Sequence, residues 1–87
     1  MNDAYAKTDA MLRAFSAEHG IRISSVQEVS EVATAALLGL PVSTLRQQVA
    51  EGRAPVRPSS IHGIHRRYRF DDIVAAHVAA QRRALDE

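Results

Sequence analysis

The sequence lacks several kinds of residue, and each absence excludes a class of protein. None of the 87 residues is a cysteine, which excludes a disulfide framework, a thiol nucleophile and any zinc site built on thiolates. No apolar run approaches the ~20 residues that are needed to cross a bilayer. The N-terminal residues have neither the basic start nor the apolar stretch of a signal peptide. We therefore expect a cytoplasmic protein without a membrane partner.

Lysine is nearly absent as well, because Lys7 stands alone beside ten arginines. Arginine is a planar donor that can form two parallel hydrogen bonds with a phosphate or a guanine edge, although a GC-rich genome also favours arginine codons. Apolar residues make up 46% of the chain and charged residues 24%, which is typical of one small globular domain. We assign residues 1–24 to an N-terminal helix and connector, and residues 25–87 to a single compact domain.

The formal net charge of +1 hides a segregation of charge along the chain. Residues 41–70 contain six arginines and one acidic residue, Glu51, which gives this third a charge of +5. The segments 1–40 and 71–87 each carry a charge of −2. A nearly neutral protein with one basic third can still bind a polyanion through that third. The alternative is a solvated arginine-rich loop that neighbouring carboxylates balance.

Both ends of the chain favour helices. Residues 3–19 are good helix formers, and Gly20 is a typical stop. After a connector or very short strand at 21–23, the chain continues toward the central motifs. Near the other end, Asp71 and Asp72 offer an N-cap for a last helix to about residue 85. The N-terminal helix would cover the core with two apolar anchors, Leu12 and Phe15, or serve as a surface for self-association.

Two short helices are predicted in the middle of the chain. Ser25 with Glu28 fits a capping box, and Ser30 offers a second N-cap, so we place one helix at about 30–38, ended by Gly39. A second helix follows Pro41, which needs no N–H there. Apolar residues recur along it at a helical period and predict a core-facing stripe: Val42, Leu45 and Val49. Two helices joined by a short turn with glycine form a helix-turn-helix pattern.

After residue 52 the sequence no longer favours a helix. Pro55 and Pro58 oppose a helix, and the Val56–Arg57 dipeptide between them reads as a short extended piece. The second half of residues 66–70 alternates as a strand would, with Tyr68 and Phe70 on one face. The simplest interpretation is a β-hairpin over about 56–68 with an arginine-lined tip. The predicted fold is thus mainly α with a small β-hairpin wing, a winged helix-turn-helix with an extra N-terminal helix.

Three segments resemble motifs of the MerR-like superfamily. Leu38–Arg46, LGLPVSTLR, resembles its helix-turn-helix signature LGVS-x-x-TLR. Glu51–Pro55, EGRAP, resembles the E-G-(K/R)-L-P that ends its recognition helix, and Arg66–Ile73, RRYRFDDI, resembles its RRYR-x-x-D-(I/L) exit from the wing. The resemblance covers about residues 29–80. The Gln47-Gln48 pair departs from the aromatic residues that follow TLR in full MerR proteins.

The short chain resembles the excisionase and AlpA-type branch of this superfamily. That resemblance implies double-stranded DNA as the partner, and a role as an excisionase-like recombination directionality factor or a small transcription regulator of a phage or mobile element. An integrase, or a second copy of the chain on DNA, would be a further partner. We expect no cofactor and no small-molecule ligand.

The residues expected to contact DNA fall on the second central helix and the hairpin. Arginine can pair with guanine and glutamine with adenine in the major groove, and the hairpin arginines suit phosphate or minor-groove contacts. The alternative is an ordinary exposed polar face, with Thr44 tying the helix start and Arg69 pairing with Asp71 or Asp72. The predicted DNA-binding set is Ser43, Thr44, Arg46, Gln47, Arg53, Arg57, His62, His65, Arg66 and Arg67.

Enzyme and metal interpretations find little support in the residues. His62-x-x-His65 has metal-like spacing but no further ligands nearby, and we expect both histidines to be solvated. There is no glycine-rich phosphate loop, no G-x-S-x-G elbow and no paired-carboxylate setting, so we predict that the chain is not an enzyme. Two alternatives to an excisionase-like factor or transcription regulator remain. One is a protein-binding adaptor or inhibitor that keeps the fold without DNA, and the other is the DNA-binding end of a phage packaging subunit.

Overall fold

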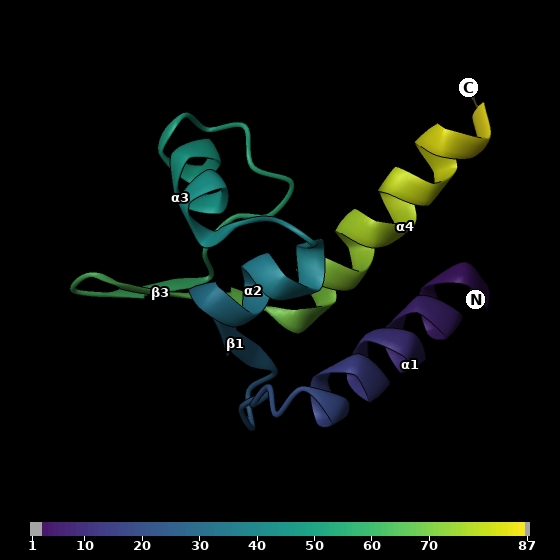
Figure 1. The fold of residues 1–87 in the computed structure, drawn as a ribbon, viewed down its shortest axis with the longest axis horizontal. Coiled ribbons are helices and arrows are strands. Elements are labelled where there is room, and N and C mark those ends of the chain that lie inside the picture. Colours follow the sequence, from purple (N-terminus) through teal and green to yellow (C-terminus); the bar gives the residue numbers. More distant parts are fainter. Residues whose placement is uncertain (1–2, 87) are drawn as a thin grey trace.

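The computed structural model describes residues 3–86, which form four helices and three short strands (Figure 1). The strands make one antiparallel sheet in the order β1-β3-β2. The prediction of a mainly helical chain with a small hairpin is confirmed. No helix within residues 3–86 has the length and apolar character to span a bilayer. In chain order the elements are α1 (Asp3–Glu18), β1 (Glu28–Ser30), α2 (Glu31–Leu38), α3 (Val42–Ala50), β2 (Ser60–His62), β3 (His65–Arg69) and α4 (Phe70–Asp86).

The sheet joins a strand near the start of the fold to a hairpin near its end. Val29 of β1 lies opposite Tyr68 of β3, and both are fully buried. Strands β2 and β3 are connected by two residues, Gly63 and Ile64. Gly63 has a φ of +64° while Ile64 does not have a positive φ, as a type II′ hairpin turn requires, and glycine adopts that conformation without steric cost. The β2–β3 hairpin projects from the body, away from the end of α4 (Figure 1).

Local capping sets the bounds of α2. The Ser30 hydroxyl accepts a hydrogen bond from the Ala33 amide at 3.1 Å, as an N-cap does. At the other end Gly39 is left-handed, with a φ of +71°, and the Leu40 amide donates to the Ala35 carbonyl at 2.9 Å. The helix predicted at about 30–38 is therefore confirmed at 31–38. Helix α3 begins after Pro41, which contributes no side-chain cap.

The core lies where the sheet, α2, α3 and α4 meet. Leu45 of α3 is fully buried, and Val42 and Val49 pack against the core, as the predicted apolar stripe requires. Helix α1 lies alongside α4 (Figure 1), with Leu12 in the core and Phe15 packed against it. Burying such side chains stabilises the fold by roughly 1.5–3 kcal/mol each. The largest fully buried apolar side chains are Tyr68, Phe70, Leu45, Ile73, Val29 and Val74.

Two capping predictions are wrong. The expected capping box of Ser25 and Glu28 does not form, because Glu28 is the first residue of β1 and its amide donates to the Ser24 hydroxyl instead. Asp71 and Asp72 are not N-caps, because α4 already begins at Phe70. They lie in its first turn, where their negative charge is favourable near the positive end of the helix dipole.

The extent of the hairpin also differs from the prediction. Its strands begin at Ser60 rather than near residue 56, and Val56–Arg57 is not a strand. Val56 is instead a buried anchor of the loop after α3. The tip consists of Gly63 and Ile64, so the arginines line the strand β3 and not the tip.

The N-cap of α2 gives a stability prediction. Ser30→Ala should lower the free energy of unfolding by about 1 kcal/mol, because the Ala33 amide loses its acceptor. Ser25→Ala is the matched control, since Ser25 is exposed in a turn outside every helix, and it should change stability by less than about 0.5 kcal/mol. Urea unfolding followed by circular dichroism measures both. Equal effects of the two substitutions would contradict the assigned cap.

Candidate functional site

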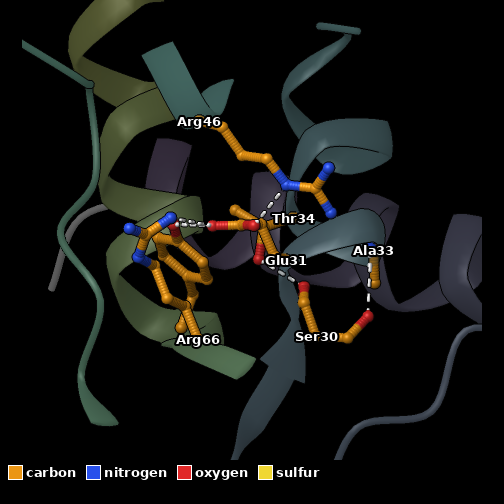
Figure 2. A network of polar contacts seen from close by, with 7 residues as sticks. Ser30, Glu31, Ala33, Thr34, Arg46 and Arg66 are labelled. Atoms are coloured by element: carbon orange, nitrogen blue, oxygen red, sulfur yellow. Dashed lines mark hydrogen bonds and ion pairs between the residues drawn. The ribbon is translucent and has the colours of Figure 1, made fainter. Parts of the chain in front are cut away.

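A buried carboxylate lies at the junction of α2, α3 and β3. Glu31, the first residue of α2, is only 8% exposed. Its Oε1 accepts from the Arg46 Nε at 2.8 Å, and its Oε2 accepts from the Tyr68 hydroxyl at 2.9 Å and from the Arg66 Nη1 at 3.4 Å. Figure 2 shows Arg46 and Arg66 approaching the carboxylate from two sides. We call Glu31, Arg46, Arg66 and Tyr68 the Glu31 cluster.

Local structure explains why these side chains meet. The cap at Ser30 places Glu31 in the first turn of α2, directly after β1. Strand β3 pairs with β1, and Arg66 and Tyr68, two residues apart, lie on the same face of β3. Burial of Leu45 fixes the rotation of α3 and so the position of the next residue, Arg46.

The carboxylate of Glu31 is held in its ionised form. Burial alone would raise its pKa, but hydrogen bonds from Arg46, Tyr68 and Arg66, together with the charge of Arg66, outweigh burial and lower the pKa below its ordinary 4.5. The same contact acts in the opposite direction on Tyr68. Burial and then the hydrogen bond to Glu31 raise the pKa of this phenol, which therefore stays protonated as the donor.

The predicted recognition residues on α3 are mostly accessible. Ser43, Arg46 and Gln47 are exposed, whereas Thr44 is half-buried. No side-chain hydrogen bond caps the start of α3, so Thr44 does not tie the helix start as the alternative proposed. Arg46 is ion-paired with Glu31 rather than free.

Four of the predicted residues line one shallow hollow between α2, α3 and the hairpin. The hollow has a volume of about 200 Å³, and its floor includes Glu31. The side chain of Ile64, 89% exposed at the hairpin tip, forms its edge. Strand β3 and α3 thus bring together Arg46, His65, Arg66 and Arg67.

The arginines of the loop after α3 and those at positions 67 and 69 of β3 differ in their partners. Arg53 pairs with Glu51 at 2.8 Å and lines a separate hollow beside α4. Arg57 is exposed and has no ion pair within the part of the chain that the structure describes. Arg67 is half-buried, and its Nη2 donates to the Glu28 carbonyl at 3.4 Å. Arg69 lies 3.7 Å from Asp71, as the alternative for this residue proposed.

The two hairpin histidines face each other across the turn. His62 and His65 form the last cross-strand pair before Gly63 and Ile64, and both are exposed. Residues 3–86 contain no group of three or more potential metal ligands around them or elsewhere. His77, on α4, has a packing role, because its Nε2 donates to the Leu37 carbonyl at 2.6 Å.

Sequence reasoning did not identify Glu31 as a functional residue. An acid directly after an N-cap is common, because it interacts favourably with the helix dipole, so Glu31 gave no special signal. Its partners are 15 to 37 residues away in the sequence. Only the pairing of β1 with β3, which the sequence did not predict, brings Arg66 and Tyr68 to this carboxylate.

Comparison with protein-family models, curated protein sequences and solved structures finds no significant match for this chain. The resemblance to the MerR-like superfamily therefore stays a prediction.

The ionised state of Glu31 predicts that the difference in stability between wild type and Glu31→Gln depends on pH. Glu31→Gln should lower the free energy of unfolding at pH 7 by about 1–3 kcal/mol, because hydrogen bonds to a charged acceptor are replaced by weaker ones. The folded pKa lies below the unfolded value, so the wild-type advantage is complete above the unfolded value near 4.5 and is lost as the pH falls through the folded pKa.

Urea unfolding of wild type and Glu31→Gln between pH 7 and pH 3 measures this difference. Glu51→Gln is the matched control, since it removes a carboxylate that is 45% exposed and pairs with a single arginine, and its effect should stay under about 0.5 kcal/mol. A wild-type advantage over Glu31→Gln that grows with acid would refute the assigned charge state.

Proposed function

We propose that this chain is a winged helix-turn-helix protein that binds double-stranded DNA with sequence selectivity. The observation that supports it best is the convergence of Arg46 from α3 and Arg66 from β3 on the single carboxylate of Glu31. Through this contact the helix and the hairpin present basic side chains to the same side of the molecule. Such a surface suits a duplex, with α3 in the major groove and the hairpin on the flanking backbone.

The exposed side chains of α3 have the chemistry that base recognition needs. Gln47 is exposed, and its side chain has no hydrogen-bond partner within residues 3–86, so the side-chain amide is available to an adenine edge. Arg46 remains accessible despite its ion pair, with 55% of the side chain exposed. The turn between α2 and α3 spans residues 39–41, and the left-handed Gly39 permits that close approach of the two helices.

The charge distribution predicts how tightly the protein would bind. The +5 of residues 41–70 attracts phosphates, while the acidic segments on either side keep the whole chain near neutral. Non-specific affinity should therefore be modest. Stable occupation of a site would need base contacts together with a second copy or a protein such as an integrase, in keeping with an excisionase-like factor or a small cytoplasmic transcription regulator of a mobile element.

A second candidate function is that of a protein-binding adaptor. It is favoured by the two isoleucines of the hairpin, Ile61 and Ile64, which are 63% and 89% exposed. Exposed apolar side chains at a projecting tip suit a contact with another protein. In addition, Glu31 already neutralises part of the charge of Arg46 and Arg66.

Substitution at the exposed surface separates base contacts from phosphate contacts. Gln47→Ala should relax discrimination at one base pair by about 1–3 kcal/mol, because it removes a base-edge partner. Arg57→Ala should weaken binding to all duplexes alike and reduce the slope of log affinity against log salt by about 1. Fluorescence anisotropy on a duplex selected from a random library, at several salt concentrations, measures both.

Arg82→Ala is the control for the loss of one positive charge, because Arg82 is exposed in the C-terminal part of α4. The end of this helix lies away from the hairpin (Figure 1). It should leave affinity, selectivity and salt slope close to wild type. If no duplex is preferred and Gln47→Ala has no effect, the DNA-binding proposal is wrong. A direct protein partner that survives nuclease treatment and is lost in Ile64→Ser would then support the adaptor.

A further inference from the structure

The contact between Glu31 and Arg46 uses only one edge of the guanidinium. The carboxylate accepts from Nε at 2.8 Å, and no hydrogen bond within residues 3–86 involves the two terminal Nη atoms of Arg46. Figure 2 shows these terminal nitrogens on the side away from the Glu31 carboxylate. A guanidinium has five N–H donors, so four remain for an external acceptor.

The carboxylate that holds Nε is itself immobilised. The Glu31 side chain is 9% exposed, and its other oxygen accepts from Tyr68 and Arg66. Tyr68 is fully buried between β1 and α2, so its hydroxyl cannot move away. A fixed carboxylate on a capped helix therefore restricts the rotamers that Arg46 can adopt.

We propose that Glu31 is a specificity-determining positioning residue that directs Arg46 to read a guanine end-on through its two Nη atoms. This inference rests on the proposed DNA-binding function. A free arginine can approach an acceptor pair either through Nε and one Nη or through both Nη atoms. Because Glu31 occupies Nε, only the second approach remains, and it matches the O6 and N7 acceptors of guanine.

The charge of the cluster favours a base edge over a phosphate as the ligand of Arg46. Two arginines and one carboxylate give the Glu31 cluster a net charge of +1. The Glu31 carboxylate offsets part of the positive charge and so weakens the attraction of Arg46 for a phosphate, whereas the neutral guanine edge offers acceptors whose binding depends less on net charge. Restricting Arg46 before binding also reduces the conformational entropy that it loses on the DNA.

The test compares variants on a duplex that wild type selects from a random library. Replacing the contacted guanine by 7-deazaguanine, which lacks the N7 acceptor, should weaken wild-type binding about 10-fold. In Arg46→Ala that penalty should disappear. In Glu31→Gln it should fall below about 3-fold, because the guanidinium is no longer fixed end-on.

Two further variants separate positioning from folding. Tyr68→Phe removes one hydrogen bond that restrains the carboxylate but leaves the bond to Arg46, so the 7-deazaguanine penalty should lie between those of wild type and Glu31→Gln. Glu51→Gln removes the carboxylate that pairs with Arg53 and should leave the penalty unchanged. If Glu31→Gln does not fold, Glu31→Asp, whose shorter carboxylate still carries the charge, replaces it and should also lower the penalty.

The outcomes distinguish this inference from the function on which it rests. If 7-deazaguanine weakens binding equally in wild type and in the folded Glu31 variant, Glu31 does not position Arg46. The proposed DNA-binding function would still stand. If Arg46→Ala instead weakens binding to all duplexes equally, Arg46 contacts a phosphate rather than a base. That result would also overturn the inference. If wild type selects no sequence, the proposed function fails and the inference fails with it.

Discussion

The acceptance of three hydrogen bonds by the buried carboxylate of Glu31 is the interaction on which the rest of the surface depends. One ion at the start of α2 holds an arginine from α3, an arginine from β3 and the hydroxyl of a core tyrosine. Removing a charge from water is costly, and it is offset only when partners satisfy the ion. Because those partners come from different elements, the carboxylate fixes the orientation of α3 relative to the β2–β3 hairpin.

The same arrangement sets the charge and the donor directions of the basic segment, residues 41–70. Arg46 and Arg66 are held in fixed orientations by Glu31, and its carboxylate neutralises part of their positive charge. A surface of this kind attracts a polyanion less strongly than six unpaired arginines would, but it presents its donors in fixed directions. Fixed donors favour selectivity over non-specific affinity, which agrees with a chain whose total charge is close to zero.

Local signals predicted the helices and the hairpin because their causes are local. The Ser30 cap, the left-handed Gly39 and the stripe ending at Val49 each act within one or two helical turns, and the structure places α2 and α3 accordingly. The predicted burial of Tyr68 and Phe70 is confirmed, but Phe70 is the first residue of α4 rather than part of the strand.

Features that depend on distant contacts could not be predicted. Strand β1 has three residues, too few to show alternation, and it forms only because β3 pairs with it. Helix α4 starts at Phe70, before the expected aspartate cap, where the Phe70 amide donates to the Gln27 carbonyl. The contacts of Glu31 depend on the same strand pairing, so the sequence did not indicate this residue. Four of the ten predicted site residues nevertheless line one hollow together with Glu31.

In the proposed function, α3 and the hairpin act as one DNA-binding surface joined at Glu31. Titration of a duplex into ¹⁵N-labelled protein, followed by the backbone amides and the arginine Nε–H signals, tests this most directly. We predict that signals of α3 and β3 shift together and saturate at the same DNA concentration, while those of α1 and the end of α4 stay in place. Shifts confined to α1, or separate saturation of α3 and β3, would contradict a joint DNA-binding surface.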